Sequence, residues 1–321
     1  MYKSILSASL ARVGQKVLHV DQNSYYGSHQ TSFDLISYTE ANETIKGVQF
    51  ESAVKFNRKF VLDMSPKLLY GNGNMVNSLV KSKVCRYLEF RNVTGFFIED
   101  GKDLIAVPCS KSALFTTTSL SPIEKRKMMK FIQENDSEEG KGNQNLDRNQ
   151  NFNEYLKSLD LTDRLEKYIG SCLAFSSTTD TLASVQKRID LFLTSYGRYG
   201  QSAFLFPLYG NCELHQAFCR LAAVFGATFC LNYEHMDTVN ELKADHYIVD
   251  ELQETEGDKV YNVATVITTE SMFNSRVSEA DVKAEGVDLM ILDDGVRVFQ
   301  VSGTGGQIAP AGYRNEEISV K

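Results

Sequence analysis

The sequence predicts an α/β fold in which a block of helices interrupts a sheet-forming chain. The chain opens with a helix, a glycine, a short apolar strand and an acid, which is typical of the second half of a nucleotide-binding βαβ unit. Helical patterns then replace strands from about residue 120 to residue 196. With 321 residues, 42% of them hydrophobic, the chain can bury a large core without cross-links.

The opening helix is predicted from Ser4 to Val13, because its apolar positions 5, 6, 10 and 13 share one side. Gly14 suits its end, and Val17 to Val20 forms a short strand that stops at Asp21. No Gly-rich turn precedes this helix, and the chain contains no G-x-G-x-x-G. We therefore expect a fold that never holds a dinucleotide, or a chain without its natural amino terminus, and both can be true.

The next hundred residues carry weaker patterns. The polar stretch 28–52 predicts a loop or mobile insert, and 63–80 predicts an interrupted helix. Strands are predicted over 86–99 and 104–107, joined by a hairpin turn at Asp100-Gly101-Lys102.

A helical insert follows. Ser121, Pro122 and Glu124 combine an N-cap, a first-turn proline and an acid three residues after the cap. We expect helices over 124–133, 152–159, 162–175 and 181–195, with a flexible acidic loop over 134–150. The predicted organisation is a sheet-rich domain formed by 1–119 and 197–321, with an inserted helical domain at 120–196.

Strands dominate the last third of the chain. A helix is predicted over 213–225, after an apolar stretch at 204–209. The predicted strands are 228–232, 246–249, 260–268, 289–292, 296–301 and 314–321.

Composition excludes several classes of function. The net charge of −7 argues against a protein that follows the nucleic-acid backbone. No apolar run approaches the roughly 20 residues of a membrane span, and no leader is visible at the start, so we expect a cytoplasmic protein. The six cysteines include no C-x-x-C pair, which predicts reduced, partly buried thiols and no metal site.

Enzyme motifs are missing as well. The chain has no G-x-S-x-G, no H-E-x-x-H and no G-x-x-x-x-G-K-[ST]. The glycines at 303, 305 and 306 predict a hairpin turn, since no Lys-Ser/Thr pair follows them. Because no spacing supports a set of nucleophile, base and orienting group, we expect no catalytic residues and no cofactor.

One stretch is dense in the residue types that dominate binding surfaces. Tyr and Arg recur between Arg198 and Arg220. Glu213 and Arg220 lie seven residues apart, two helical turns, so they share a face, whereas Leu214, Phe218 and Leu221 should face the core. The residues alone leave open whether this face is a binding surface or a solvated helix.

Two segments carry a resemblance to a known family. They are Ser195 to Gly210, continuing through Glu213 and Arg220, and the opening 17–21 with Tyr25-Tyr26-Gly27. Both resemble the Rab GDP-dissociation inhibitor and Rab escort protein family. Further segments are more similar to the escort branch: 81–93, 107–110, 119–131 and 152–156.

The resemblance implies a flavoprotein-like, GDP-dissociation-inhibitor-like sheet domain without cofactor, incomplete here, and a non-catalytic activity. Escort proteins bind GDP-bound Rab GTPases, present them to Rab geranylgeranyltransferase, shield the attached geranylgeranyl lipid and associate transiently with membranes. Burying such a lipid is favourable by roughly 0.8 kcal/mol per CH₂. The alternatives are a Rab GDP-dissociation inhibitor, a flavin or nicotinamide oxidoreductase of similar fold, and a non-functional fragment.

The resemblance also implies roles for individual residues. Tyr26, Glu213 and Arg220 match the Rab-binding residues of the family, and Arg198 and Tyr209 are expected to support them. Phe152 is the candidate apolar anchor for the prenyltransferase. Cys212 and His215 stand where the family has Gly and Pro, and we expect them to shift the loop beside Glu213.

Overall fold

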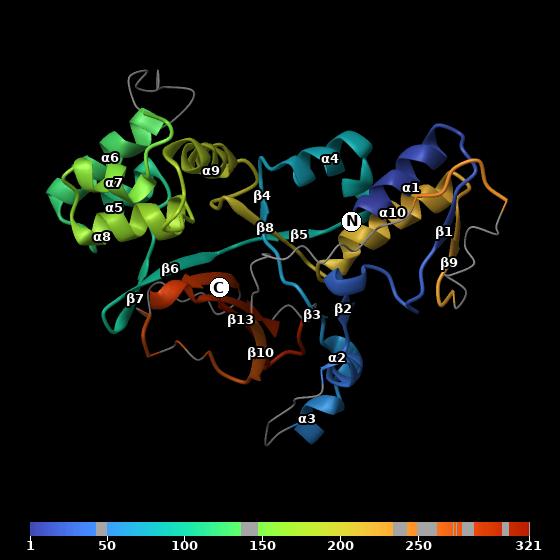
Figure 1. The fold of residues 1–321 in the computed structure, drawn as a ribbon. Coiled ribbons are helices and arrows are strands. Elements are labelled where there is room, and N and C mark those ends of the chain that lie inside the picture. Colours follow the sequence, from blue (N-terminus) through green and yellow to red (C-terminus); the bar gives the residue numbers. More distant parts are fainter. Residues whose placement is uncertain are drawn as a thin grey trace.

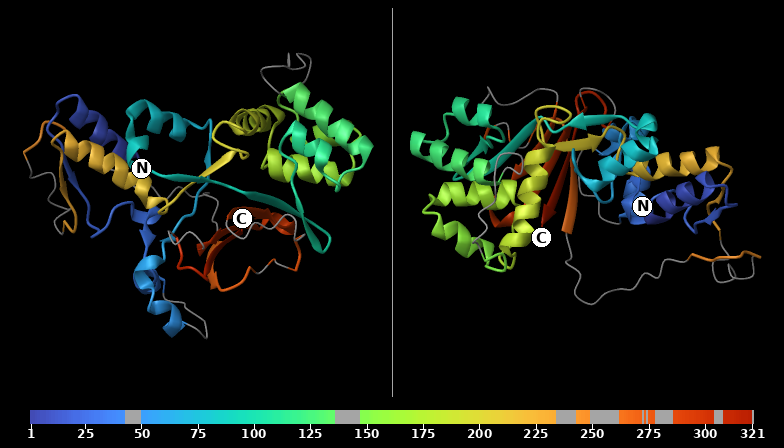
Figure 2. Two further views of the ribbon diagram at one scale, coloured as in Figure 1. Left: turned by 180° about the vertical axis from the view of Figure 1, so that it is seen from behind. Right: turned by 90° about the horizontal axis from the view of Figure 1, so that it is seen from above.

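A computed structural model describes residues 1–42, 50–135, 147–233, 243–248, 262–271, 273, 275–277, 286–303 and 308–320. Helices α5 to α9 form a cluster at one end of the molecule, whereas α1 and α10 lie together at the other end (Figure 1). Strands β5, β6 and β8 cross the space between them, whereas β1 and β9 lie at the end that holds α1 and α10 (Figure 1). A view from above also separates the helical cluster from the α1–α10 pair (Figure 2). The predicted mixture of helices and sheets is therefore present.

The elements have the following bounds. The helices are α1 Tyr2–Arg12, α2 Leu35–Ala41, α3 Phe50–Val54, α4 Asn74–Ser82, α5 Lys111–Thr116, α6 Pro122–Asn135, α7 Phe152–Ser158, α8 Asp163–Lys167, α9 Leu182–Ser195 and α10 Cys212–Val224. The strands are β1 Leu18–Val20, β2 Ser32–Phe33, β3 Leu62–Asp63, β4 Leu69–Tyr70, β5 Phe90–Asn92, β6 Gly95–Asp100, β7 Asp103–Ala106, β8 Phe204–Pro207, β9 Thr228–Cys230, β10 Asn262–Thr268, β11 Val287–Ile291, β12 Arg297–Ser302 and β13 Arg314–Val320.

The opening helix and strand are confirmed, but the helix buries another side than its predicted apolar one: Ser4, Ser7, Ala8 and Ala11 are buried, whereas Leu6 and Val13 are exposed. Helix α1 ends before Gly14, whose φ of +87° is the left-handed conformation that suits glycine after a helix. Strand β1 pairs in parallel with β9, placing Leu18 opposite Thr228. Since α1 also packs along α10, the first residues of the chain lie beside residues two hundred positions later.

The expected loop over 28–52 is wrong in its described part. This segment forms β2 and the helices α2 and α3. Asp34 caps α2 by accepting a hydrogen bond from the Ser37 backbone N–H at 2.8 Å. These elements span only two to seven residues, which is too short for periodicity to show in a polar sequence.

Two further expectations need correction. The helix predicted over 63–80 is confined to α4, because Pro66 cannot continue a helix and β3 and β4 occupy the first part of the segment. The strand predicted over 86–99 is divided into β5 and β6, after a 3₁₀ turn at Val84–Tyr87. The strand expected over 246–249 has no counterpart at 243–248, and residue 249 lies outside the described residues.

The largest sheet has six strands in the order β10-β13-β12-β11-β6-β7. Its neighbours are antiparallel except β6 and β11, which run in parallel. The hairpin predicted at Asp100-Gly101-Lys102 joins β6 and β7, and Gly101 has a φ of +68°. Strand β8 lies between β4 and β5 in a smaller sheet and leads directly into α10.

The predicted capping box starts α6. The Ser121 hydroxyl accepts the Glu124 N–H at 3.3 Å, and the Glu124 carboxylate accepts the Ser121 N–H at 2.9 Å. The predicted helix at 162–175 divides into α8 and a π-helical turn, Tyr168–Leu173. The 134–150 loop lies largely outside the described residues. None of the helices in the described part of the chain combines the length and apolar composition needed to cross a membrane.

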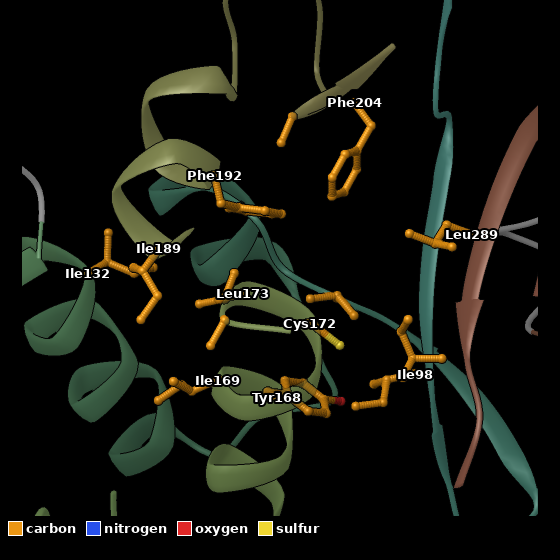
Figure 3. Packing of buried hydrophobic residues seen from close by; sticks show 14 of the residues in the cluster. Ile98, Ile132, Tyr168, Ile169, Cys172, Leu173, Ile189, Phe192, Phe204 and Leu289 are labelled. Atoms are coloured by element: carbon orange, nitrogen blue, oxygen red, sulfur yellow. The ribbon is translucent and has the colours of Figure 1, made fainter. Parts of the chain in front are cut away.

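One apolar core joins the helices to the sheet. Ile98 of β6 and Leu289 of β11 point toward Tyr168 and Phe192 of the helical cluster (Figure 3). Ile98, Tyr168 and Phe192 are fully buried. The division into a sheet-rich and an inserted helical domain stays a prediction.

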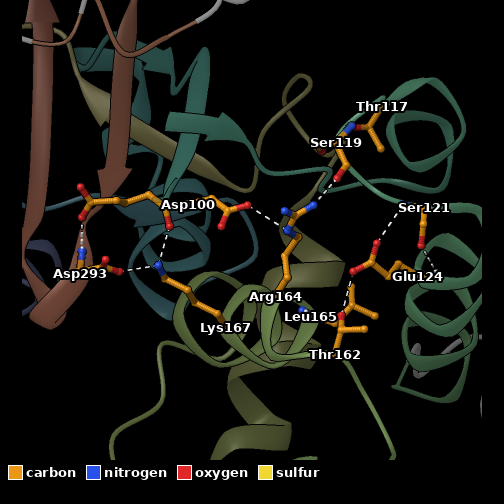
Figure 4. A network of polar contacts seen from close by, with 11 residues as sticks. Asp100, Thr117, Ser119, Ser121, Glu124, Thr162, Arg164, Leu165, Lys167 and Asp293 are labelled. Carbon is orange, nitrogen blue, oxygen red and sulfur yellow. Dashed lines mark hydrogen bonds and ion pairs between the residues drawn. The ribbon is translucent and has the colours of Figure 1, made fainter. Parts of the chain in front are cut away.

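Charged contacts strengthen the same junction. Arg164 of α8 forms an ion pair with Asp100 at 2.9 Å (Figure 4). Lys167 donates to the Glu99 carbonyl at 2.5 Å and pairs with Asp293. Helix α8 is therefore held against the end of β6 by two cationic side chains, one of which also pairs with Asp293 after β11.

We expect Phe192→Ala to lower the free energy of unfolding by about 3–5 kcal/mol, because it leaves a cavity in this shared core. Phe115→Ala is the matched control, since Phe115 is 74% exposed and its loss should change stability by about 0.5 kcal/mol or less. Urea denaturation of both variants measures the difference. Equal destabilisation by the two substitutions would contradict the packing.

Candidate functional site

Helix α10 presents one polar stripe and buries its other faces. Leu214, Phe218 and Leu221 are buried as predicted. Glu213 is half-buried, and Gln216 and Arg220 are exposed. The spacing of these three polar residues, three and then four apart, places them along one side of the helix. The sequence analysis missed Gln216, although its position three residues after Glu213 and four before Arg220 places it on the same side of the predicted helix.

The amino end of α10 is held by residues from other elements. Asn211 occupies the N-cap position without a side-chain capping bond. Instead, the Asp63 carboxylate of β3 accepts the Asn211 backbone N–H and side-chain amide, both at 2.9 Å. The Ser32 hydroxyl of β2 accepts the Cys212 N–H at 3.0 Å. A carboxylate is favourable at this position because the helix dipole is positive there.

Asp63 is itself deeply buried. Its side chain is 3% exposed, and burial raises the pKa of the carboxyl despite the hydrogen bonds that favour the charged form. The Ser32 hydroxyl donates to it. Sequence reasoning missed Asp63, because it lies 148 residues from the helix that it contacts.

Glu213 has an unusual electrostatic environment. Burial and, to a smaller extent, the nearby Glu89 raise the pKa of its carboxyl to about 7, although a hydrogen bond from the Tyr209 backbone N–H opposes the shift. Among the described residues, the Oε2 atom of Glu213 is buried without a hydrogen-bond partner. Near neutral pH this carboxyl can therefore act as a donor or as an acceptor for a bound molecule.

Arg220 is exposed two turns further along α10. Its guanidinium carbon lies 4.8 Å from the ring centre of Tyr87, in the 3₁₀ turn beside α10. This cation–π contact restrains the guanidinium near the surface. Tyr209 follows β8 and is 42% exposed, next to the amino end of the helix. Tyr87 and Glu89 were not predicted as site residues, although both lie in the segment 81–93 that resembles the escort branch.

The turn containing Tyr26 lies against the same helix. The Tyr26 carbonyl accepts a hydrogen bond from the Cys212 thiol at 3.2 Å. Its ring meets Phe229 of β9 edge-on at 6.1 Å, and burial raises the pKa of its hydroxyl. Gly27 ends the turn with a φ of +96°. Tyr26 is thus fixed beside the amino half of α10.

We call this group of Tyr26, Tyr209, Glu213, Gln216 and Arg220 the α10 surface. It combines three polar side chains along the helix with two aromatic rings near its amino end, residue types suited to binding another protein. His215 points into the core, where burial lowers the pKa of its imidazole to about 4 and keeps it neutral at pH 7. Across the described ranges, no three His, Cys, Asp or Glu side chains gather to hold a metal ion.

Two of the predicted site residues lie elsewhere. Arg198 follows α9, where it donates to Asn72 at 2.5 Å and lies over the ring of Tyr199. Phe152 opens α7 and is fully buried, 6.3 Å from the ring of Tyr155. An anchor has to be exposed, so this burial does not support an insertion of Phe152 into a partner, and its role stays a prediction. Its place in the apolar pattern of a short helix predicted burial equally well.

Comparison with protein families places the chain. The family model described as "GDP dissociation inhibitor" matches residues 1–297. The chain belongs to the GDP dissociation inhibitor family. The resemblance noted in the sequence is thereby confirmed.

This member of the GDP dissociation inhibitor family is similar to curated relatives over part of their length. "Rab proteins geranylgeranyltransferase component A" of Drosophila melanogaster is 32% identical over 275 residues, covering 77% of this chain and 54% of the relative. "Rab proteins geranylgeranyltransferase component A 1" of Homo sapiens is 38% identical over 192 residues, covering 58% of this chain and 29% of the relative. The chain thus aligns with about half of the fly protein and less than a third of the human one.

Solved structures confirm the predicted fold class for this family member. The Rab GDI of Plasmodium falciparum matches with a TM-score of 0.73 and 21% identity, covering 99% of this chain and 79% of that one. An oxidoreductase from Methanosarcina mazei matches with a TM-score of 0.56 and 11% identity, covering 99% and 76%. At these identities the matches establish the fold alone.

Glu213→Gln is expected to stabilise the protein more at pH 8 than at pH 5. In the folded protein the Glu213 carboxyl has a pKa of about 7, against the usual value of 4.5, so the native state holds this proton more tightly than the unfolded state. The stability of the unaltered protein therefore falls as the pH rises from about 4.5 to about 7, and glutamine removes this loss. For this half-solvated group the difference should be on the order of 1 kcal/mol. Urea denaturation at both pH values measures it. An identical effect of the substitution at both would contradict the assignment.

Gly210→Ala should destabilise the protein more than Gly226→Ala. Both glycines have nearly the same left-handed conformation, with φ values of +90° and +89°. A Cβ at Gly210 would lie 2.6 Å from the Ser32 hydroxyl and 3.0 Å from an Asp63 oxygen, whereas one at Gly226 would meet open space. The extra cost at Gly210 should be about 1–3 kcal/mol in chemical denaturation. Equal costs would show that the contact has room to relax.

Proposed function

We propose that this chain acts as a Rab escort protein. It would be a non-catalytic accessory component of Rab geranylgeranyltransferase that binds GDP-bound Rab, presents it for prenylation and delivers it from the cytosol to membranes. The observation that carries the proposal is the α10 surface, where Glu213 and Arg220 share one helix side next to Tyr26 and Tyr209. The names of the fly and human component A relatives support it.

The residues of the α10 surface suit contact with a folded protein. Glu213 can accept from a Rab backbone N–H or share a proton with a hydroxyl, because its pKa lies near 7. The guanidinium of Arg220 lies over the Tyr87 ring, and its N–H groups can donate to Rab carbonyls or a carboxylate. Tyr26 and Tyr209 supply apolar area together with hydroxyl groups.

The transferase would contact the helical cluster. Phe152 is buried, so the docking surface needs other apolar side chains. Phe115 of α5 and Ile123 of α6 are 74% and 70% exposed in this cluster. We propose these two in place of Phe152, since exposed apolar side chains are the ones that a partner can cover.

Lipid shielding has a candidate space as well. A cavity of about 220 Å³ lies between β6, β8, α5 and α9, with Phe96, Phe192 and Phe204 in its lining. Cys109 lies there too, and burial raises the pKa of its thiol to about 12, in keeping with apolar surroundings. Part of an isoprenoid chain would be favourable in this space.

An in vitro prenylation assay tests the proposal. GDP-loaded Rab, the transferase and geranylgeranyl diphosphate are combined with the chain, and we expect it to stimulate lipid transfer. Glu213→Ala and Arg220→Ala should each lower the initial rate about tenfold or more when Rab is limiting, as expected for central binding residues. Glu51→Ala on α3 is the control, because it removes an exposed carboxylate distant in sequence from α10. No stimulation by the unaltered chain would refute the proposal.

The second candidate is a Rab GDP-dissociation inhibitor, which the match to the family model described as "GDP dissociation inhibitor" favours. The two functions differ in one partner. An escort protein binds the prenyltransferase, whereas an inhibitor only retrieves prenylated Rab. Co-precipitation with purified transferase in the presence of unprenylated Rab separates them. For the oxidoreductase alternative, a yellow purified protein would indicate a bound flavin, which we do not expect.

A further inference from the structure

We propose that Asp63 is the positioning residue of the α10 surface: through Ser32, Asn211 and Cys212 it fixes where Glu213 stands relative to Tyr26. The link to Rab binding rests on the function proposed above, whereas the structural part can be tested alone. Hydrogen bonds connect β3 to α10, and α10 to the Tyr26 turn.

Asp63 holds Asn211, the residue before α10, through two hydrogen bonds. One carboxylate oxygen accepts the Asn211 backbone N–H, and the other accepts its side-chain amide, both at 2.9 Å. Two bonds to one residue restrain its rotation as well as its position. Since Asn211 supplies no capping bond of its own, the amino end of α10 is set by β3.

Ser32 links Asp63 to Cys212, the next residue along the chain after Asn211. It lies directly opposite Asp63 in the β2–β3 pair, and its hydroxyl donates to the Asp63 carboxylate. The Ser32 hydroxyl oxygen also accepts a hydrogen bond from the Cys212 N–H at 3.0 Å. The first two N–H groups of this helix end are therefore both satisfied from one strand pair.

Cys212 then connects the helix to the Tyr26 turn. Its thiol donates to the Tyr26 carbonyl at 3.2 Å, and it accepts from the Thr31 hydroxyl at 3.7 Å. Thr31 precedes Ser32, so both ends of the segment between Tyr26 and Ser32 are fastened to Cys212. The neighbouring Glu213 is consequently held in register with Tyr26.

The contact is close enough to transmit small changes. Gly210 passes the strand pair at a distance that leaves no room for a Cβ beside the Ser32 hydroxyl. The Asp63 side chain is 3% exposed, so water cannot replace a lost bond without a local opening. A substitution of Asp63 should therefore move or loosen the amino end of α10.

The matched experiment compares Asp63→Asn with Asp288→Asn. Both aspartates are buried, and burial raises the pKa of both carboxyls. Asp288 lies on β11 and accepts a hydrogen bond from Thr94 at 3.4 Å, away from α10. Amide hydrogen exchange at residues 211–214 is measured in the absence of Rab, and Rab affinity is measured in parallel.

We expect Asp63→Asn to speed exchange at residues 211–214 at least tenfold relative to Asp288→Asn, and to weaken Rab binding by a similar factor. Exchange at 211–214 that is the same in both variants would overturn the proposal. If the unaltered chain fails to bind Rab, the proposed function fails, and the exchange measurement still decides the structural part. Should Asp63→Asn not fold, Ser32→Ala replaces it, with the same expected result at residue 212.

The Cys212 link has its own conservative variant. Cys212→Ser keeps a donor for the Tyr26 carbonyl, whereas Cys212→Ala removes it. We expect Cys212→Ala to weaken Rab binding severalfold and Cys212→Ser to restore it to within about twofold of the unaltered chain. A merely structural role predicts no such rescue. Equal affinities for the serine and alanine variants would overturn this step.

Discussion

A buried carboxylate at the amino end of α10 determines where the candidate surface lies. Burying a charge without partners is costly, and Asp63 is tolerated in the core because it accepts three hydrogen bonds. Two of those bonds come from Asn211, which precedes a helix far away in the sequence. The polar stripe of α10 is thus placed by β3, and its geometry depends on an element that contributes nothing to the exposed surface itself.

Local patterns predicted the parts of the molecule that are locally determined. The periodicity of α10 gave its buried face, and the turn at Gly101 gave the β6–β7 hairpin. The cap at Ser121 gave the start of α6. In each case a few consecutive residues decide the conformation, because the stabilising contacts lie within one turn of helix or across one hairpin.

The remaining features depend on partners distant in the sequence. Asp63 and Ser32 carry no motif, and their role arises only when β2 and β3 pair and α10 lands against them. Tyr87 gains its part through Arg220, more than a hundred residues later. Phe152 is a related case, since one sequence pattern fits both an exposed position and the buried position that it occupies. The fold is also shared with oxidoreductases, and it does not identify the function, because function is set by the residues of a site.

The apolar core that spans the helical cluster and the six-stranded sheet has a thermodynamic consequence. Ile98 and Leu289 belong to the sheet, yet their packing partners include Phe192 and Tyr168. Neither region can lose its structure without exposing the apolar side chains of the other, so the two should melt together in a single calorimetric transition. An excised 120–196 segment would expose a large apolar surface to water and should aggregate rather than persist as a monomer.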